Sequence, residues 1–434
     1  MLSERSKEIF NKTFKMVGDK FSTYPEKREY INKLVENTKD RPIKVLVVYH
    51  LFDCDGHGVM NICKSIFSNN ENIEAEYYYC KTRADEVFDK RNEDGVMETK
   101  SVKDIFDEYD LILIGDLSFT KEKCIKVDEY LKKAGEKLFI VDHHATAEYM
   151  NEYNWAYVVP HDLDKENISC GTLLMYWLIT TPMEKLFNVL GLTNFLDYIN
   201  INYYIPEYVA ITSLYDTYMW KRLDDEHDKE IVQLYNTAFG YDKGAYDKQI
   251  IERLSEGYTP LDDDYMNQFK LIVNTIENIA EECSRTCKIY DYTDNIKFAI
   301  CYVGVPMYYS QVGEMILEEH PEIKFVLMIN MNTMECSLRS RDDFDLSEIV
   351  KPLGGGGHPQ AAGFPLVNRF HTQPHNLQEI FFSGIDNVFV NLLKTKKPVY
   401  SGVITIENSE DLDNNTMGQY LQEILSDGGN ENEI

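Results

Sequence analysis

Residues 137–147 read KLFIVDHHATA, and this stretch indicates both a fold and a site. The apolar run before Asp142 is typical of a strand that is buried on both faces of a sheet. His143 and His144 follow at once and point in opposite directions on an extended chain, so neither of them obviously improves packing. The stretch therefore predicts a strand that delivers Asp142, His143 and His144 to a functional site.

Two earlier segments share this pattern of an apolar run that ends in polar groups. VLVVYHLFDCDGHG (45–58) places His50, Asp53 and Asp55 just past a strand, and LILIGDLS (111–118) places Asp116 there. Strands are expected at 43–49, 73–79, 111–115 and 137–141, with helices at 58–67 and 121–134 between them. This alternation predicts an α/β fold with a parallel, doubly wound sheet.

Ligands of an open parallel sheet bind beyond the carboxyl ends of its strands, so the three segments are expected to meet at one edge. An aspartate alone at a strand end usually caps the next helix, and for Asp116 taken alone this is the favoured interpretation. Taken together, the segments favour a metal site, because several carboxylates cannot share a small volume without a counter-charge. Carboxylate and imidazole ligands without thiolate suit Mn²⁺ or Mg²⁺ better than structural zinc.

The rest of the chain predicts a second, smaller α/β domain. Residues 171–290 are expected to be helical, with a long helix near 262–288, followed by strands at 296–303, 324–330 and 333–340 and a helix near 376–395. The expected organisation is an N-terminal helical extension (1–42), a first domain (43–240), a helical linker (241–292), a second domain (293–396) and an acidic tail (397–434). The active site is expected in the cleft between the two domains.

At these residues the sequence resembles the DHH phosphoesterase superfamily. Four segments are similar to its motifs: Asp53-x-Asp55-Gly56, Asp116 after its apolar strand, the triplet Asp142-His143-His144, and Asp216 within VAITSLYDTYMW (209–220). The last of these most resembles the oligoribonuclease (nano-RNase) B type group. One departure is that the family's usual first histidine position holds Tyr49, with His50 one residue later, while His57 is expected to lie in an exposed loop.

The downstream half resembles the DHH-associated C-terminal domain in SLRSRDDFDLSEIVKPLGGGGHPQAAGFPL (337–366), which also excludes family II pyrophosphatases. Arg339 and Arg341 are two residues apart and are expected on one face of a strand. The glycine run lets the backbone approach a ligand closely and offers N–H groups to an anion. The resemblance implies that substrate is bound by Arg339, Arg341, Gly355, Gly356, Gly357 and His358.

The resemblance also implies two divalent ions, with Mn²⁺ favoured over Mg²⁺. One ion is expected on His50, Asp53 and Asp116. The other is expected on Asp55, Asp116, His143 and Asp216, so that Asp116 bridges the pair. His144 is implied to contact the scissile phosphate or to assist the leaving oxygen, and Asp142 to orient a histidine.

The implied function is the two-metal hydrolysis of short oligonucleotides to mononucleotides. Two alternatives stay open: hydrolysis of a cyclic (di)nucleotide or a nucleoside 3′,5′-bisphosphate, and a non-catalytic nucleotide-binding regulator. Long-strand exonucleases of the RecJ type are disfavoured, because the sequence shows neither an OB-like β domain nor a basic channel. A homodimer is also left open.

The composition agrees with a small substrate. The 434 residues include 44 Lys and Arg against 73 Asp and Glu, a formal net charge of −29, so the chain is expected to avoid long duplex DNA and membrane surfaces. No apolar run approaches the ~20 residues that span a bilayer, and residues 1–21 lack the apolar core of a signal peptide. The nine scattered cysteines favour reduced thiols and a cytoplasmic location.

Overall fold

The structure is a computed structural model. It describes residues 2–21, 41–67, 70–91, 97–99, 101–134, 137–181, 204–293, 295–304, 309–330, 332–341, 344–353 and 355–365. The chain divides into two compact units, Met1–Asn274 and Thr275–Ile434. The boundary falls inside helix α12 (Asp263–Thr286), within the segment 241–292 that is expected to connect two domains. The other expected domain boundaries and the expected cleft stay predictions, and the expected helix at 376–395 and tail at 397–434 lie outside the described residues.

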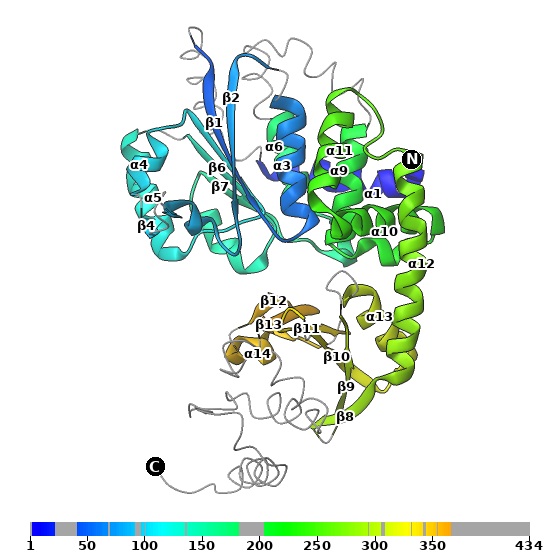
Figure 1. Cartoon of the computed structure of the whole chain (residues 1–434). Helices are drawn as coiled ribbons and strands as arrows, with labels where there is room; N and C mark the ends of the chain where they lie inside the picture. The colour runs from blue at the N-terminus through cyan, green and yellow to red at the C-terminus, as the bar shows by residue number, and fades with distance from the viewer. Residues whose placement is uncertain are drawn as a thin grey trace, which may run out of the picture. The chain divides into compact units, whose positions relative to one another are not determined.

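A five-stranded sheet forms the centre of the first unit, in the order β2-β1-β5-β6-β7 (Figure 1). Its strands are β1 (Ile43–His50), β2 (Ile73–Cys80), β5 (Leu111–Gly115), β6 (Leu138–Asp142) and β7 (Ala156–Val158). Every neighbouring pair is parallel, which confirms the predicted α/β fold. Strand β7 is not predicted from the sequence, because three residues are too few for a periodic signal.

The strands of this sheet alternate between two hydrophobic cores, because successive side chains of a strand point to opposite faces. Val45 and Val47 of β1 belong to one core, and Leu46 and Val48 belong to the other. Helices α3 (Cys54–Phe67) and α6 (Gly171–Thr180) cover the first face, and α4 (Val102–Phe106) and α5 (Lys121–Ala134) cover the second (Figure 1). Burial on both faces explains why these strands are continuous apolar runs.

Helices make up most of the remaining first unit. They are α1 (Glu4–Phe21), α3 (Cys54–Phe67), α4 (Val102–Phe106), α5 (Lys121–Ala134), α6 (Gly171–Thr180), α9 (Tyr204–Asp216), α10 (Glu226–Tyr241) and α11 (Lys243–Ser255). Shorter elements are the 3₁₀ turns η1 (Ala84–Phe88), η2 (Ala145–Glu152), η3 (Leu163–Lys165) and η4 (Met219–Arg222), and the antiparallel pair β3 (Asp89–Arg91) and β4 (Met97–Thr99). No helix within the described ranges is both long and apolar enough to cross a membrane.

Helix α1 is part of the core of the first unit. Its apolar side chains Ile9, Phe10 and Val17 are buried together with residues of α6 and α9. Just before the helix, the Ser3 backbone N–H donates to the buried Asp228 carboxylate of α10 at 2.8 Å. The hydroxyl of Tyr157 in β7 donates to the Val17 carbonyl at 2.7 Å. The first helix is therefore fixed by residues that lie far along the chain.

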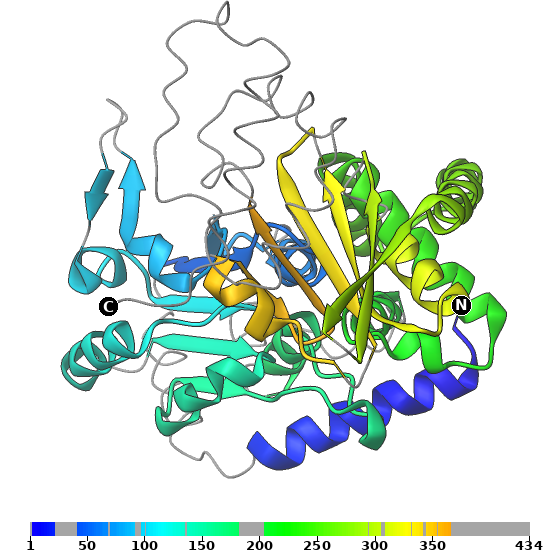
Figure 2. The same ribbon diagram turned by 90° about the horizontal axis from the view of Figure 1, so that it is seen from below.

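The second unit contains a mixed six-stranded sheet in the order β12-β13-β11-β10-β9-β8 (Figure 2). Its strands are β8 (Lys288–Thr293), β9 (Ile296–Tyr302), β10 (Ile323–Asn330), β11 (Glu335–Ser340), β12 (Gly356–His358) and β13 (Ala361–Pro365). Only β9 and β10 pair in parallel, and they are joined through helix α13 (Tyr309–Glu319). Helix α13 and the C-terminal part of α12 bury one face of the sheet, and α14 (Ser347–Val350) with η6 (Lys351–Leu353) buries the other.

Candidate metal centre

Three neighbouring strands of the first unit end at residues of the predicted site. β1 ends at His50, β6 ends at Asp142, and Asp116 directly follows β5. Because β1, β5 and β6 are adjacent and parallel, their carboxyl ends lie at the same edge of the sheet. The structure thus brings the three predicted segments together.

The first group of side chains consists of His50, Asp53 and Asp116. His50 Nδ1 lies 2.5 Å from Asp53 Oδ2 and 3.4 Å from Asp116 Oδ2. The other ring nitrogen, Nε2, lies 3.0 Å from the carbonyl oxygen of Lys81, so it donates there and Nδ1 faces the carboxylates. Asp53 Oδ1 accepts the Gly56 N–H at 2.8 Å in the first turn of α3. The backbone contacts of His50 Nε2 and Asp53 Oδ1 therefore hold the two side chains in place, and His50 Nδ1 and Asp53 Oδ2 are directed at the group.

The second group is arranged around His143. Its Nε2 atom lies 3.7 Å from Asp55 Oδ2, 3.5 Å from Asp216 Oδ2 and 3.3 Å from Asp116 Oδ1. Asp55 comes from α3 and Asp216 is the last residue of α9. Asp116 therefore belongs to both groups, and its two carboxylate oxygens face different histidines.

The first turn of α6 holds Asp55 in place. The Gly171 N–H donates to Asp55 Oδ2 at 2.5 Å, and the Thr172 N–H donates to Oδ1 at 2.7 Å. The Thr172 hydroxyl donates to the Asp55 carbonyl oxygen at 2.7 Å. Unpaired N–H groups and the helix dipole at a helix N-terminus both stabilise a negative charge. The sequence analysis missed this contact, since Ser169-Cys170-Gly171-Thr172 before an apolar run indicates only the start of a helix.

Asp116 has an uncommon backbone conformation, with φ of +58° in the left-handed region. Aspartate and asparagine adopt this region more readily than other residues that carry a Cβ atom. The Asp116 N–H donates to the Val141 carbonyl at 3.0 Å, which ties the end of β5 to β6. A Cβ atom added to Gly171 would lie 2.5 Å from the Asp116 Cβ atom, so this close approach requires glycine at 171.

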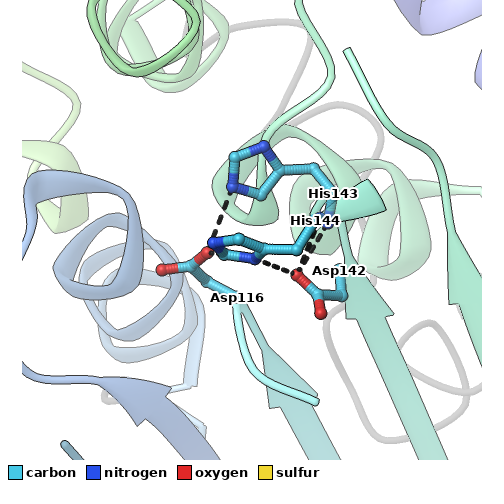
Figure 3. A group of neighbouring side chains, drawn as sticks. All are labelled: Asp116, Asp142, His143 and His144. Atoms are coloured by element: carbon cyan, nitrogen blue, oxygen red, sulfur yellow. Dashed lines mark hydrogen bonds and ion pairs between the residues drawn. The ribbon is translucent and has the colours of Figure 1, made fainter. Parts of the chain in front are cut away.

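The DHH turn after β6 is organised by Asp142 (Figure 3). Asp142 Oδ1 accepts the backbone N–H of His143 at 2.7 Å, and His144 Nδ1 lies 2.7 Å from the same oxygen. Nδ1 is therefore the donor to Asp142, and this contact fixes the orientation of the His144 ring. Figure 3 shows that both histidine rings also reach toward the Asp116 carboxylate, at 3.3 Å and 3.8 Å.

The electrostatics of the cluster show carboxylates that are crowded together. Burial and the neighbouring Asp116 raise the pKa of Asp55 to about 6, although the charge of His143 partly opposes this. Burial also raises the pKa of Asp216 well above its usual value. Burial alone would lower the pKa of His50, but its hydrogen bonds to Asp116 and Asp53 outweigh that effect and raise the pKa to about 11. The site as a whole therefore favours bound positive charge.

The side chains fit a divalent cation. Three overlapping sets place one potential ligand atom per residue within 4.8 Å of one another: Asp116, Asp142, His143 and His144; His50, Asp53 and Asp116; and Asp55, His143 and Asp216. Asp116 Oδ2 and Asp216 Oδ2 are buried without a hydrogen-bond donor among the described residues, which is costly unless a cation binds there. None of the three sets contains a cysteine, and this donor chemistry suits Mn²⁺ or Mg²⁺.

The expectation for His57 is wrong, because this residue is buried within α3 and is 5% exposed. The helix starts earlier than the predicted residue 58, at Cys54, because Asp53 caps it. His57 Nδ1 lies 2.7 Å from Asp247 Oδ2 of α11, and Nε2 lies 2.8 Å from the Leu51 carbonyl. His57 therefore anchors the turn that carries the predicted ligands of the first group.

Comparison with known proteins supports a family for the chain. No family model matches it. A curated protein, oligoribonuclease NrnB of Bacillus subtilis (strain 168), is 25% identical over 338 residues, which cover 75% of this chain and 74% of the relative. The chain is thus similar to this oligoribonuclease over about three quarters of both lengths. The resemblance drawn from the DHH triplet and its accompanying motifs is thus confirmed.

Solved structures resemble the chain more distantly. RecJ of Thermus thermophilus in complex with Mn²⁺ is 15% identical, with a TM-score of 0.44, over 85% of this chain and 53% of that chain, so the chain spans about half of its length. A DHH domain from a member of a family of ribosomal proteins is 17% identical, with a TM-score of 0.45, over 89% of this chain and 92% of that one. The resemblance to the DHH phosphoesterase superfamily therefore depends on the site residues and on the curated relative.

The two arginines of the second unit differ in what they bind. β11 ends at Ser340, so Arg341 lies just past the strand, and both arginines contact α13. Arg341 Nε donates to the Ile323 carbonyl at 3.1 Å, and Nη2 donates to the Leu317 and His320 carbonyls near the end of α13. Its guanidinium group therefore satisfies backbone oxygens of the fold.

Arg339 retains an unused donor. Its Nη1 atom donates to Ser337 Oγ at 3.0 Å, and its Nη2 atom donates to Ser310 Oγ at 3.2 Å. The Nε atom is buried and has no hydrogen-bond partner among the described residues. Of the two arginines, Arg339 is the better candidate for a ligand contact.

The glycines at 355–357 of the second unit combine structural and open positions. A Cβ atom at Gly355 would lie 2.1 Å from the Gly363 carbonyl oxygen, and Gly357 has a φ of +135°. Both positions therefore require glycine for the backbone itself. A Cβ atom at Gly356 would meet no other atom within 4 Å, so this position is open to a ligand. The backbone of His358 pairs with Ala361 of β13.

His161, which the sequence analysis did not single out, lies beside the cluster. Its ring centre is 5.9 Å from that of His143. Burial and the charges of His143 and His144 lower the pKa of His161 to about 4, so it stays neutral. The sequence VVPHD around it gives no motif that could have indicated this position.

Proposed function

We propose that the protein is a metal-dependent phosphodiesterase that hydrolyses short oligonucleotides to mononucleotides. The observation that carries this proposal is the pair of ligand groups that share Asp116 at the ends of three adjacent parallel strands. The curated relative, an oligoribonuclease, supports a nucleic acid substrate. An enzyme is favoured over a non-catalytic binding protein by the intact residues Asp53, Asp55, Asp116, His143 and His144.

The two ligand groups suit two divalent ions, with Mn²⁺ favoured. One ion would be held by His50, Asp53 and Asp116, and the other by Asp55, Asp116, His143 and Asp216. When bound, such ions lower the pKa of a water molecule and neutralise the charge that develops on a phosphodiester. Burial and then the charge of Asp116 raise the pKa of Asp55, and a bound cation would offset both effects.

The other groups of the turn act on the substrate in this proposal. Asp142 accepts a hydrogen bond from His144 Nδ1 and so holds the ring. His144, whose side chain is 34% exposed, contacts the scissile phosphate or assists the leaving oxygen. Asp142 is then the residue that orients the histidine.

In the second unit, Arg339, Gly356 and His358 are proposed to bind the rest of the substrate. A charge-assisted hydrogen bond from Arg339 to a phosphate oxygen suits its unused Nε donor. Three other residues were expected to bind substrate as well, namely Arg341, Gly355 and Gly357. In this proposal they stabilise the fold that holds Arg339, Gly356 and His358 in place.

Short substrates and a reducing compartment are part of the proposal. The net charge of −29 repels long polyanions, whereas a short oligonucleotide carries few phosphates. All nine cysteines are unpaired, which supports a cytoplasmic location.

The deciding experiment is a substrate panel with Mn²⁺. It contains end-labelled oligomers of two to about twenty-five nucleotides, a cyclic dinucleotide, a cyclic mononucleotide and a nucleoside 3′,5′-bisphosphate. We expect the highest kcat/KM on the shortest linear oligomers, and activity that is lost with EDTA and restored best by Mn²⁺. Preference for a cyclic nucleotide or a bisphosphate would replace the proposed substrate, and full activity in metal-free protein would overturn the use of metals.

A further inference from the structure

The candidate metal centre is most exposed at Asp53 and His144, which form its open side. The side chains of Asp116 and His143 are 1% and 2% exposed, and that of Asp55 is fully buried. In contrast, the side chains of Asp53 and His144 are 40% and 34% exposed. A substrate can therefore contact the cluster at its open side.

An aromatic ring stands on this open side. Phe52 lies in the chain between His50 and Asp53 and is 56% exposed, although it is a large apolar residue. Its ring is perpendicular to the His50 ring, with the ring centres 5.9 Å apart. Single exposed apolar residues are common on protein surfaces. Phe52 differs from such residues because it lies in the chain between the predicted ligands His50 and Asp53, which keep it close to the site.

The backbone that carries Phe52 is held by several hydrogen bonds. Lys243 Nζ donates to the Phe52 carbonyl at 2.8 Å, and its ammonium group lies 5.8 Å from the centre of the Phe52 ring. The neighbouring Leu51 donates its N–H to the Cys80 carbonyl at 3.0 Å, and His57 Nε2 lies 2.8 Å from the Leu51 carbonyl. The turn is thus preorganised with the ring at the edge of the site.

We propose that Phe52 is a stacking surface for a nucleobase of the substrate whose phosphate lies at the metal centre. This inference rests on the proposed function and adds the group that recognises the nucleoside. An exposed aromatic ring gains little from water but stacks well on the face of a base. Because every base has such a face, the contact selects nucleotides over other phosphate esters without selecting a particular base.

The test compares two ligands that differ only in the base. Binding of adenosine 5′-monophosphate and of ribose 5-phosphate to the Mn²⁺-loaded full chain is measured by calorimetry. We expect Phe52→Ala to raise the Kd for the nucleotide about 5- to 150-fold and to leave the Kd for the sugar phosphate within about twofold. Phe52→Trp should retain tight binding, whereas Phe52→Leu should resemble Phe52→Ala. Tyr258→Ala is the matched control, since Tyr258 is 55% exposed and lies on a different loop.

A second measurement separates this inference from the proposed function. Wild type and Phe52→Ala are assayed on a dinucleotide and on the same dinucleotide with an abasic residue in place of one nucleoside. Loss restricted to the ligands and substrates that carry the base supports the stacking surface. Equal weakening of both ligands by Phe52→Ala, or no weakening, overturns it. If wild type leaves the dinucleotide intact while nucleotide binding still depends on Phe52, oligonucleotide hydrolysis is wrong and the stacking surface stands.

Discussion

Asp116 shows how one residue can serve both ligand groups. Its left-handed backbone turns the side chain back over the end of β5, so that Oδ1 faces His143 and Oδ2 faces His50. A right-handed or extended residue at this position would aim the carboxylate elsewhere. The backbone conformation and the bridging geometry are therefore a single feature.

Asp116→Asn is the sharpest test of this residue, because asparagine tolerates the same backbone region and has nearly the same size. We expect kcat on a dinucleotide to fall by about three orders of magnitude, since several kcal/mol of transition-state stabilisation would be lost. Asp164→Asn, at a side chain that is 90% exposed, is the control. A kcat within about tenfold of wild type would leave Asp116 with a structural role only.

We expect Arg339 to affect substrate binding and Arg341 to affect the stability of the fold. Arg341→Leu is expected to lower the free energy of unfolding by about 1–3 kcal/mol and to leave KM unchanged, because it leaves backbone carbonyls unpaired. Arg339→Leu is expected to raise KM about 10- to 100-fold and to preserve kcat. A phosphate contact that is equally strong in the ground state and in the transition state affects substrate binding alone. Urea unfolding and steady-state kinetics on a dinucleotide measure the two effects. The reverse pattern would mean that Arg341 is the phosphate ligand.

At the scale of elements, the site depends on how α6 starts. The helix brings its first N–H groups to Asp55 and its first residue against Asp116, so one helix terminus touches both ligand groups. This arrangement needs a small residue at 171, where any Cβ atom would collide with Asp116.

Gly171→Ala is expected to lower the free energy of unfolding by about 1–3 kcal/mol, the usual cost of overpacking a buried contact. It should also raise the Mn²⁺ concentration needed for half-maximal activity, because Asp116 and Asp55 must move. Gly244→Ala is the matched control, since the nearest atom to the added Cβ is 3.5 Å away in the first turn of α11. There, alanine should be neutral or stabilise by up to about 1 kcal/mol. Equal behaviour of the two variants in urea unfolding and Mn²⁺ titration would contradict this role of Gly171.

Elements with strong periodic patterns could be predicted from the sequence, and elements fixed by tertiary contacts could not. The buried strands β1, β5 and β6 are continuous apolar runs, so both their existence and their polar ends were predictable. β8 was missed because its alternating exposed residues follow a long helix without a clear break. The burial of His57 depends on Asp247, which is 190 residues away in the chain, and no local pattern carries that information. The same holds for Arg341, whose partners belong to α13 and β10.

For the molecule as a whole, charge should set the preferred substrate length. With a net charge of −29, each added phosphate beyond the bound ones costs electrostatic repulsion. We expect the ratio of kcat/KM for a dinucleotide to that for an oligomer of about twenty-five nucleotides to be high at about 0.05 M salt and to fall toward about 0.5 M salt, where repulsion is screened. Steady-state kinetics across the salt series measure it. A ratio that rises with salt would indicate a basic track for long strands.

The place of α1 in the core has a consequence for how the protein is made. Ser3 finds its partner Asp228 only 225 residues later, and a ribosome that adds about 5–20 residues per second needs roughly 10–45 s to cover that interval. During this time the apolar face of α1, with Ile9, Phe10 and Val17, has no completed surface to pack against. A nascent chain that waits with such a helix exposed is a natural client for a chaperone at the ribosome exit. Slowing synthesis between α1 and α10 should therefore increase misfolding more than slowing it after α10.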